Sequence, residues 1–206
     1  MAVAIMIGVG LGILSSIKRH SIIDHAAQIF AILGVSFPSF WLGVIFVWVF
    51  AIMLGWLPAI SNGHGKELIL PSITLGTAAA AILARLTRSS MLDVLSRDYI
   101  RTARAKGLRE RAVVFIHALR NAMIPVLTVI GLEFGSLLAG AVVIESVFRR
   151  QGLGLRLIEG IVSRDYPVVQ GLVLIAAVVY ALMNLLVDVL YTYVDPRVRL
   201  VSHVRG

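Results

Sequence analysis

Residues 166–187 read YPVVQGLVLIAAVVYALMNLLV and contain no charged side chain. As an α-helix this stretch of 22 residues would rise about 33 Å, because each residue adds about 1.5 Å. The hydrocarbon core of a bilayer is about 30 Å thick. The stretch therefore predicts a transmembrane helix, and the fold depends on how many such stretches the chain holds.

Charge-free stretches recur along the whole chain of 206 residues. They cover 1–17, 25–65, 68–84, 121–132 and 134–144, and the last two flank Glu133 as one span. Hydrophobic residues make up 59% of the chain and charged residues 15%, against about 25% charged in soluble domains. The sequence predicts an all-α, polytopic membrane protein, a single transmembrane domain over 1–206. Five transmembrane helices are expected near 1–17, 30–57, 68–91, 122–146 and 167–190.

Lysine and arginine gather on one side of these predicted spans. Nine of the 19 lie between Arg85 and Arg120. The same side would hold Lys18, Arg19, Arg197, Arg199 and Arg205. Cytoplasmic segments carry an excess of basic residues, so the chain is expected to begin outside and to end in the cytoplasm. Two crossings within 25–65 would reverse this asymmetry, which favours one crossing with a broken or interfacial segment around Pro38.

The N-terminal stretch 1–17 differs from a secretory signal, because its charges, Lys18 and Arg19, follow the apolar core. It is expected to be a helix that runs from outside to inside. Seventeen residues barely span a bilayer, so we expect this helix to begin before residue 1. The chain has no cysteine, which excludes a disulfide scaffold and a thiolate metal site.

The longest hydrophilic segment lies within 93–121, a predicted cytoplasmic loop. It contains SRDYIRTARAKGLRERAVVFIHALRN, residues 96–121. Asp98 can accept backbone amides at the start of a helix, and Lys106 with Gly107 can end one. A short helix over 99–106 is therefore predicted, followed by a second helix from about Arg109. That second helix is expected to bend where Pro125 enters the bilayer.

The short helix has two interpretations. Ala103 and Gly107 are four residues apart, so both lie on one side and allow another backbone to approach, with basic residues around them. Such a helix would dock into a groove of a partner protein. A basic loop held against anionic lipid headgroups needs only the charge, and the residues alone leave both interpretations open.

This segment resembles the cytoplasmic loop of ATP-binding-cassette (ABC) importer permeases, whose pattern is E-A-A, three residues, G, nine residues, then I-x-L-P. Ala103, Gly107 and Leu119 match it. The strings RTARAKG, HALRNA and IPVLT resemble the dipeptide, oligopeptide and glutathione branch in particular. The likeness extends over nearly the whole chain, with GVSFPSFW at 34–41, LGWLP at 54–58, LPSITLG at 70–76, GLG at 152–154, RDYPVVQG at 164–171 and NLLVDVLY at 184–191.

The resemblance implies one permease subunit of an importer in a bacterial or archaeal plasma membrane. Its expected partners are a second permease subunit, homologous or identical, two ATP-binding subunits, an extracytoplasmic substrate-binding protein and the lipid bilayer. Family members carry a further N-terminal helix before the point where this chain starts. By the resemblance, the residues that couple to the ATPase are Asp98, Arg101, Thr102, Ala103, Arg104, Ala105, Lys106, Gly107, His117, Leu119, Arg120 and Asn121.

The residues themselves favour hydrolysis of ATP on another chain. The phosphate-binding pattern G-x-x-x-x-G-K-[ST] is absent, since Glu67 follows Gly65 and Lys66. His117 has no second ligand at metal-binding spacing. No catalytic residue, cofactor, metal or nucleic-acid partner is therefore expected.

Two further features lie in the fourth predicted span. Glu133 is expected to face protein or water, because an ionised carboxylate in the bilayer costs about 2.5 to 3.5 kcal/mol. It would line the pore or form an interhelical hydrogen bond, and the second is favoured. Small residues at Gly131, Gly135, Ser136 and Gly140 predict close helix packing, within the chain or against a second permease.

Other classes of membrane protein remain as alternatives. An ion-coupled secondary transporter would show internal repeats and several intramembrane carboxylates, and the sequence shows one clear buried acid and no evident repeat. A membrane scaffold that does not transport would use the basic loop only to bind lipid.

Overall fold

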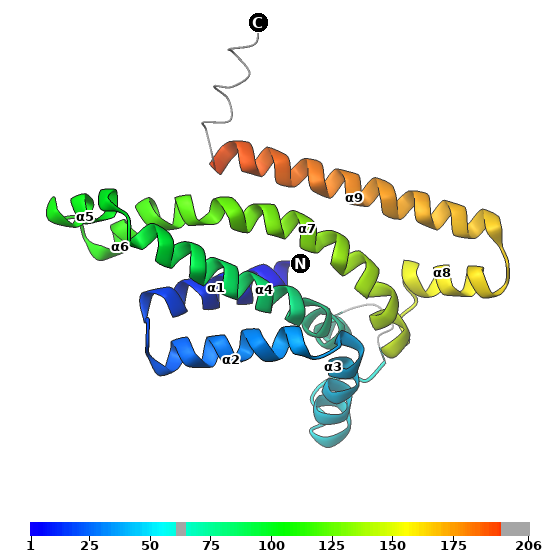
Figure 1. Cartoon of the computed structure of the whole chain (residues 1–206). Coiled ribbons are helices and arrows are strands. Elements are labelled where there is room, and N and C mark those ends of the chain that lie inside the picture. Colours follow the sequence, from blue (N-terminus) through cyan, green and yellow to red (C-terminus); the bar gives the residue numbers. More distant parts are fainter. Residues whose placement is uncertain (61–64, 195–206) are drawn as a thin grey trace, which may run out of the picture.

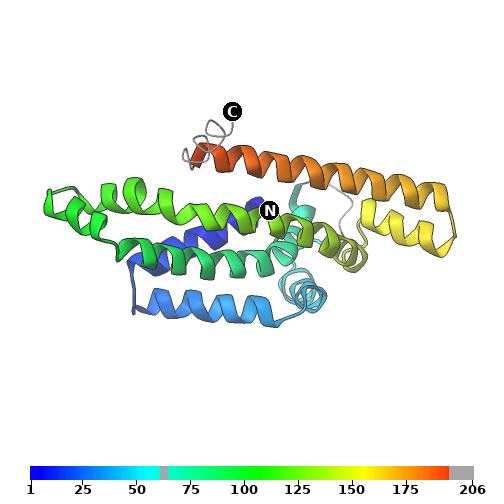
Figure 2. The same cartoon turned by 45° about the horizontal axis from the view of Figure 1, so that its top comes forward.

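The structure, a computed structural model, describes residues 1–60 and 65–194, with side chains up to Val189. Within these ranges the chain is helical and contains no strand. The helices are α1 (Ala2–Ile17), α2 (Ile22–Ser36), α3 (Ser39–Phe46), η1 (Val47–Met53), η2 (Gly65–Leu68), α4 (Ile69–Leu95), α5 (Asp98–Ala105), α6 (Glu110–Ala112), η3 (Val113–Ala118), α7 (Leu119–Val147), α8 (Leu153–Val162) and α9 (Tyr166–Val194). Helices α1, α2, α4, α7 and α9 lie roughly alongside one another, with α5 and α6 at one end and α8 at the other (Figures 1 and 2).

The predicted all-α membrane fold is confirmed. Three helical segments of the described chain are long and apolar enough to cross a bilayer, namely Gly65–Leu95, Glu110–Val147 and Tyr166–Val189. A fourth candidate is the bent pair Ile22–Ser36 and Ser39–Met53, and α1 is a shorter apolar helix of 16 residues. Four of the five predicted spans thus correspond to the bent pair, α4, α7 and α9, whereas the first corresponds to α1, which is shorter than a full span.

The predicted boundaries of the second span, 30–57, are wrong. The helix begins at Ile22, where the Ser21 hydroxyl accepts a hydrogen bond from the Asp24 amide at 3.3 Å. It ends before Phe37, which is extended (φ −92°, ψ 133°), because a residue that precedes proline avoids the helical conformation. The arm of α3 and η1 then leaves at 109°, so it points away from the long helices (Figure 1). A break near Pro38 is therefore present, and it divides the candidate span into two helical arms.

Small residues let α1 and α2 pack closely on α4. A Cβ atom built on Gly8 would lie 2.5 Å from the Ala80 carbonyl oxygen, and one on Gly12 would lie 2.5 Å from Thr87 Cβ. A Cβ atom on Gly34 of α2 would lie 2.7 Å from Ala81 Cβ. In lipid, helices associate through such close van der Waals packing. Helix α4 is therefore the centre of the N-terminal half of the bundle.

Helix α7 connects this half to α9. Gly131 faces Val187, and a Cβ atom on Gly135 would lie 2.8 Å from the Tyr180 ring, whereas Gly140 faces Leu75 of α4. Ser136 is exposed. Three of the four small residues predicted to form a packing surface thus contact other helices of the same chain.

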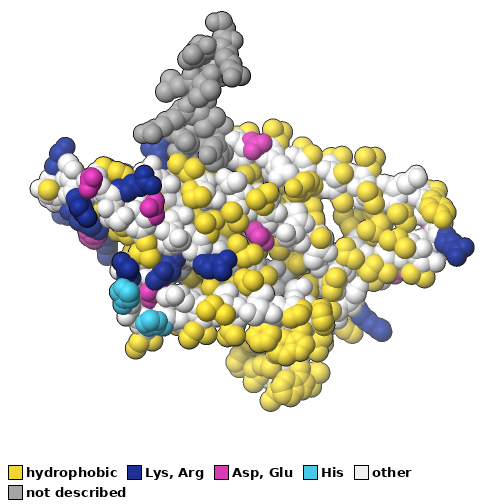
Figure 3. Space-filling model, viewed as in Figure 1, with side chains coloured by type: hydrophobic (Ala, Val, Ile, Leu, Met, Phe, Trp, Pro, Cys, Tyr) yellow, Lys and Arg dark blue, Asp and Glu magenta, His cyan; other side chains and the backbone are white. Residues whose placement is uncertain are grey.

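Basic side chains gather at the end of the bundle that carries α5 and α6 (Figure 3). The predicted contribution of Arg197, Arg199 and Arg205, and the predicted cytoplasmic C-terminus, lie outside the described residues. Pro125, where a bend was expected, lies inside α7. The π-helical segment η3 precedes it and continues directly into α7.

Candidate functional site

Helix α5 forms the turn between α4 and the helix that leads into α7. It covers Asp98–Ala105, one residue earlier at each end than predicted. Asp98 is the first helical residue, but its carboxylate caps no backbone amide. It lies instead 3.6 Å from the Arg101 guanidinium, and both side chains are exposed. The expected capping role of Asp98 is therefore wrong, because the helix begins one residue before the position that the cap requires.

Gly107 ends α5 in the left-handed conformation, with φ +78°. Its amide donates to the Arg104 carbonyl at 2.9 Å, and the Leu108 amide donates to the Ala103 carbonyl at 3.4 Å. These two bonds are the pair that closes a helix at a glycine C-cap. A Cβ atom on Gly107 would meet no atom within 4 Å, so the backbone conformation alone makes glycine the favoured residue here.

One face of α5 is buried within the chain. Ile100 is 0% exposed and Ala103 is 8% exposed, and both belong to an apolar cluster. The other members of this cluster are Met91, Val94, Val113, Val114, Ala118 and Ala122. Ala103 therefore has to be small because of α4 and η3 of its own chain, whereas Gly107, just after the helix, is exposed. Burial of this apolar face fixes α5 to the ends of two long helices.

The opposite face of α5 is polar and exposed. Its exposed residues include Arg101, Thr102, Arg104, Ala105 and Lys106. The Arg104 guanidinium donates to Glu110 at 2.6 Å and 3.1 Å, and this hydrogen bond raises the pKa of Arg104. This bidentate pair connects α5 to the beginning of the next helix.

The remaining predicted coupling residues lie at the end of η3 and at the start of α7. Asn121 donates to the Tyr99 hydroxyl at 3.2 Å and to the His117 carbonyl at 2.9 Å, which joins α5 to α7. His117 and Leu119 are half-buried, and Arg120 is exposed. A cavity of about 530 Å³ lies next to these residues, lined by Asp93, Arg97, Tyr99, Asn121, Ile124 and Pro125 among others. The structure thus brings most of the predicted site together around α5, with Arg120 exposed beside it.

Glu133 lies apart from this site, in the middle of α7. It is half-buried and forms no hydrogen bond or ion pair with any residue that the structure describes. The favoured interhelical hydrogen bond of Glu133 is therefore not present within the described chain. A cavity of about 380 Å³ lies one turn away, lined by Thr128, Gly131, Asn184 and Asp188 among others.

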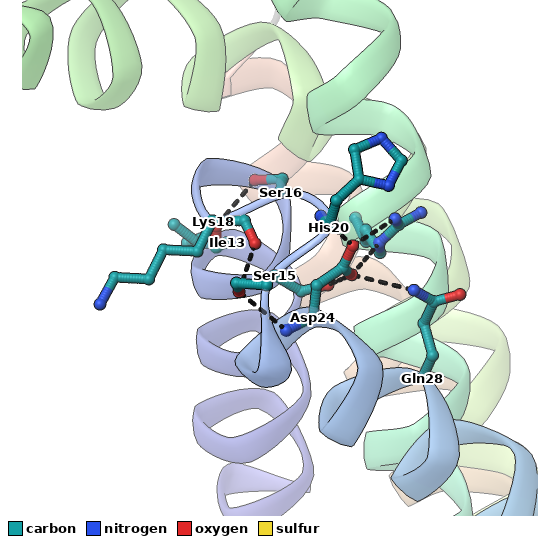
Figure 4. A network of polar contacts seen from close by, with 9 residues as sticks. Ile13, Ser15, Ser16, Lys18, His20, Asp24 and Gln28 are labelled. Carbon is teal, nitrogen blue, oxygen red and sulfur yellow. Dashed lines mark hydrogen bonds and ion pairs between the residues drawn. The ribbon is translucent and has the colours of Figure 1, made fainter.

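Sequence reasoning missed a buried ion pair. Asp24 of α2 is 0% exposed and accepts two hydrogen bonds from the Arg88 guanidinium of α4, at 2.6 Å and 2.8 Å. The Ser15 hydroxyl (2.5 Å), the His20 amide (3.0 Å) and the Gln28 side chain (3.0 Å) donate to the same carboxylate. Figure 4 shows Ser15, His20 and Gln28 converging on Asp24. This network fastens the α1–α2 turn to α4.

Glu145 is a second residue that the sequence analysis did not single out, and its position explains why residues 152 and 154 of the GLG string are glycines. Its carboxylate accepts a hydrogen bond from the Leu155 amide at 2.9 Å, at the N-terminus of α8. A Cβ atom on Gly152 would collide with this carboxylate, and one on Gly154 would lie 2.6 Å from Val142 Cα. An anionic side chain at a helix N-terminus is stabilising. The two glycines therefore let α8 fold back against α7.

Within the described residues, no group of three histidine, cysteine, aspartate or glutamate side chains has the arrangement of a metal site.

The bundle of apolar helices and the polar turn at α5 define a polytopic α-helical membrane protein. Its family follows from comparison with known sequences. Residues 8–200 match the model of the family described as binding-protein-dependent transport system inner membrane component, and the chain belongs to this family.

The comparison with curated relatives agrees. The chain is 48% identical over 199 residues to the glutathione transport system permease protein GsiC of Pectobacterium atrosepticum, and equally to that of Escherichia coli K12. These matches cover 97% of this chain and 65% of the relatives' length. The chain thus spans about two thirds of the curated relatives it matches.

A similar fold is found in solved structures of the inward-facing MetNI methionine ABC transporter. The TM-score is 0.72, and the match covers 93% of this chain and 88% of the other chain. Sequence identity is 18% in one crystal form and 19% in another, so this likeness concerns the fold alone. The predicted resemblance to ABC importer permeases is confirmed by the family model and by the identity with the glutathione permeases.

Proposed function

We propose that this protein is a permease subunit of an ABC importer that moves peptides or peptide-like solutes across the inner membrane. Family membership and the identity with glutathione permeases support this function over an ion-coupled secondary transporter or a membrane scaffold. Its substrate class is that of dipeptides, oligopeptides or glutathione.

The two faces of α5 support a coupling role. The face with Ile100 and Ala103 is buried against α4 and η3, and the opposite face is exposed and basic. A subunit that bound the exposed face would therefore move the ends of α4 and of the helix that leads into α7, because the buried face of α5 packs against both. The segment between these helices includes the π-helix η3, and π-helical turns are frequent at functional sites. Residues 93–121 would thus act as a cytoplasmic coupling loop.

The complete importer would contain partners beyond this chain. Two ATP-binding subunits would bind the α5 turn from the cytoplasm and hydrolyse ATP. A second permease subunit, homologous or identical, would complete the pore, and an extracytoplasmic protein would deliver the substrate. Glu133, unpaired within the described chain, would lie on the pore side and meet the amino group of a peptide.

A pair of glycine variants tests the coupling role. Gly107 and Gly55 both have positive φ, +78° and +62°, and an added Cβ atom meets nothing within 4 Å at either position. Gly107 ends α5, whereas Gly55 follows η1, so Gly55→Trp is a matched control for Gly107→Trp. With the importer assembled in proteoliposomes, Gly107→Trp is expected to abolish ATP-driven uptake and to reduce copurification of the ATP-binding subunits. Equal effects of both variants, or normal uptake with Gly107→Trp, would contradict the proposal.

A further inference from the structure

A groove lies between α2 and α4, in the half of the bundle nearer to α5. Its volume is about 420 Å³, and it lies next to the Asp24–Arg88 ion pair. One part of its lining is polar, with Gln28, Arg85 and Ser89, and another part is apolar, with Ala31 and Ile32. The groove is therefore amphipathic along its walls.

The polar part carries an unneutralised positive charge. Arg85 and Arg88 are three residues apart on α4 and share one face of that helix. Arg88 is held by Asp24, whereas Arg85 is exposed and forms no hydrogen bond or ion pair among the described residues. The nearby α1–α2 turn adds Lys18 and Arg19, both exposed. This part of the groove thus attracts an anion that the described chain does not supply.

The apolar part continues the groove along α2. Ala31 lines its floor and is 7% exposed, whereas Ile32 is 64% exposed. No charged residue occurs on α2 after His25, so this wall lies within the span. A small soluble anion would contact only the basic part and would leave the apolar wall without a partner. A ligand that fits both parts has an anionic head and a hydrocarbon chain.

We propose that this groove binds an anionic phospholipid of the cytoplasmic leaflet. The phosphate would contact Arg85 and Ser89, and an acyl chain would lie along Ala31 and Ile32. Basic pockets between transmembrane helices on the cytoplasmic side are known sites for anionic headgroups. Because the lipid would contact α2 and α4 together, it would reinforce the contact that the Asp24–Arg88 pair makes nearby. The assignment to the cytoplasmic leaflet rests on the orientation proposed above for the α5 turn, whereas lipid binding itself does not require transport.

Native mass spectrometry of the purified protein tests the site. Phosphatidylglycerol and phosphatidylcholine are titrated in parallel against the protein and against Arg85→Gln, with Arg101→Gln as the control. Arg101 is also an exposed arginine, and it lies on α5 outside the groove. We expect about a fivefold loss of phosphatidylglycerol binding in Arg85→Gln, the effect of about one basic contact, and less than a twofold loss in Arg101→Gln. Equal losses in the two variants, or no preference for phosphatidylglycerol over phosphatidylcholine, would overturn the proposal.

Two further measurements separate a lipid from a soluble anion. Ile32→Ser removes the apolar contact and keeps the charge, so it is expected to weaken binding of phosphatidylglycerol as well. Inorganic phosphate added in excess is expected to leave the bound phosphatidylglycerol in place. If phosphate displaces the lipid completely, or if Ile32→Ser binds the lipid normally, the groove is an anion site without an acyl-chain contact and the lipid assignment is wrong.

Discussion

Replacement of Asp24 by asparagine removes the charge that holds Arg88. Asp24 is fully buried and accepts hydrogen bonds from four residues, so asparagine also leaves several donors without an anionic acceptor. Loss of one partner of a buried ion pair costs about 3 to 5 kcal/mol. The Arg88 side chain keeps 23% exposure and is partly hydrated, which favours the lower end of this range, about 3 kcal/mol.

This cost predicts a clear change in thermal stability. For a chain of 150 to 250 residues, each kcal/mol lowers the midpoint of unfolding by about 2 to 4 °C, so Asp24→Asn is expected to lower it by about 6 to 12 °C. The assay is thermal unfolding of the purified protein in detergent, followed by circular dichroism. The double variant with Arg88→Gln is expected to lose less than the sum of the two single variants, because the unpaired cation is also removed.

The exposed pair Asp93–Arg97 provides the matched control. It has the same residue types at 2.8 Å, but both side chains are more than half exposed. Exposed pairs contribute about 0 to 1 kcal/mol, so Asp93→Asn is expected to shift the midpoint by no more than about 4 °C. Equal shifts for Asp24→Asn and Asp93→Asn would refute the reasoning, as would strictly additive effects in the Asp24 and Arg88 double variant.

Two other pairs of variants follow from the packing. Gly12→Ala places a Cβ atom 2.5 Å from Thr87 Cβ and is expected to destabilise the bundle by about 1 to 3 kcal/mol. Gly10→Ala meets no atom within 4 Å and is expected to be neutral or stabilising. Thermal midpoints measured in detergent compare the two variants. Ala103→Leu overfills the apolar cluster under α5 and should also cost about 1 to 3 kcal/mol. Ala105→Leu, on the exposed face, is expected to keep the thermal midpoint but to weaken copurification of the ATP-binding subunits. The account of α5 fails if Ala103→Leu is as stable as the native protein.

The sequence pattern predicts the order of the apolar helices because charge-free runs reflect the cost of charge in lipid, but α1 is too short to count with the three or four candidate spans of the described chain. The short helix at 98–105 was also predictable within one residue, since Gly107 supplies the left-handed turn that ends it. The second helix begins before its predicted start because the charge-free stretch starts only after Asp24. Its charge is compensated by Arg88, 64 residues later, and a local pattern does not reveal such a pair.

Two local signals in the sequence were nevertheless available. Ser21 and Asp24 have the spacing of a helix N-terminus, which marks the true start of α2. Gly8 and Gly12 have the spacing of a close helix contact, and they pack more tightly than the small residues singled out in α7. The burial of Ala103 within its own chain was not predictable, because it depends on how α4 and η3 converge on α5.

The central claim is that the exposed face of α5 contacts an ATP-binding subunit. The chain has no cysteine, so a single cysteine at Ala105 or, as a control, at Gln151 near α8 gives an unambiguous attachment point. Both positions are exposed, and they lie at opposite ends of the bundle. With a short cysteine-directed crosslinker in the assembled importer, Ala105→Cys is predicted to form a product with the ATP-binding subunit and Gln151→Cys to form none. The account is contradicted if Ala105→Cys gives no such product, or if Gln151→Cys gives it instead.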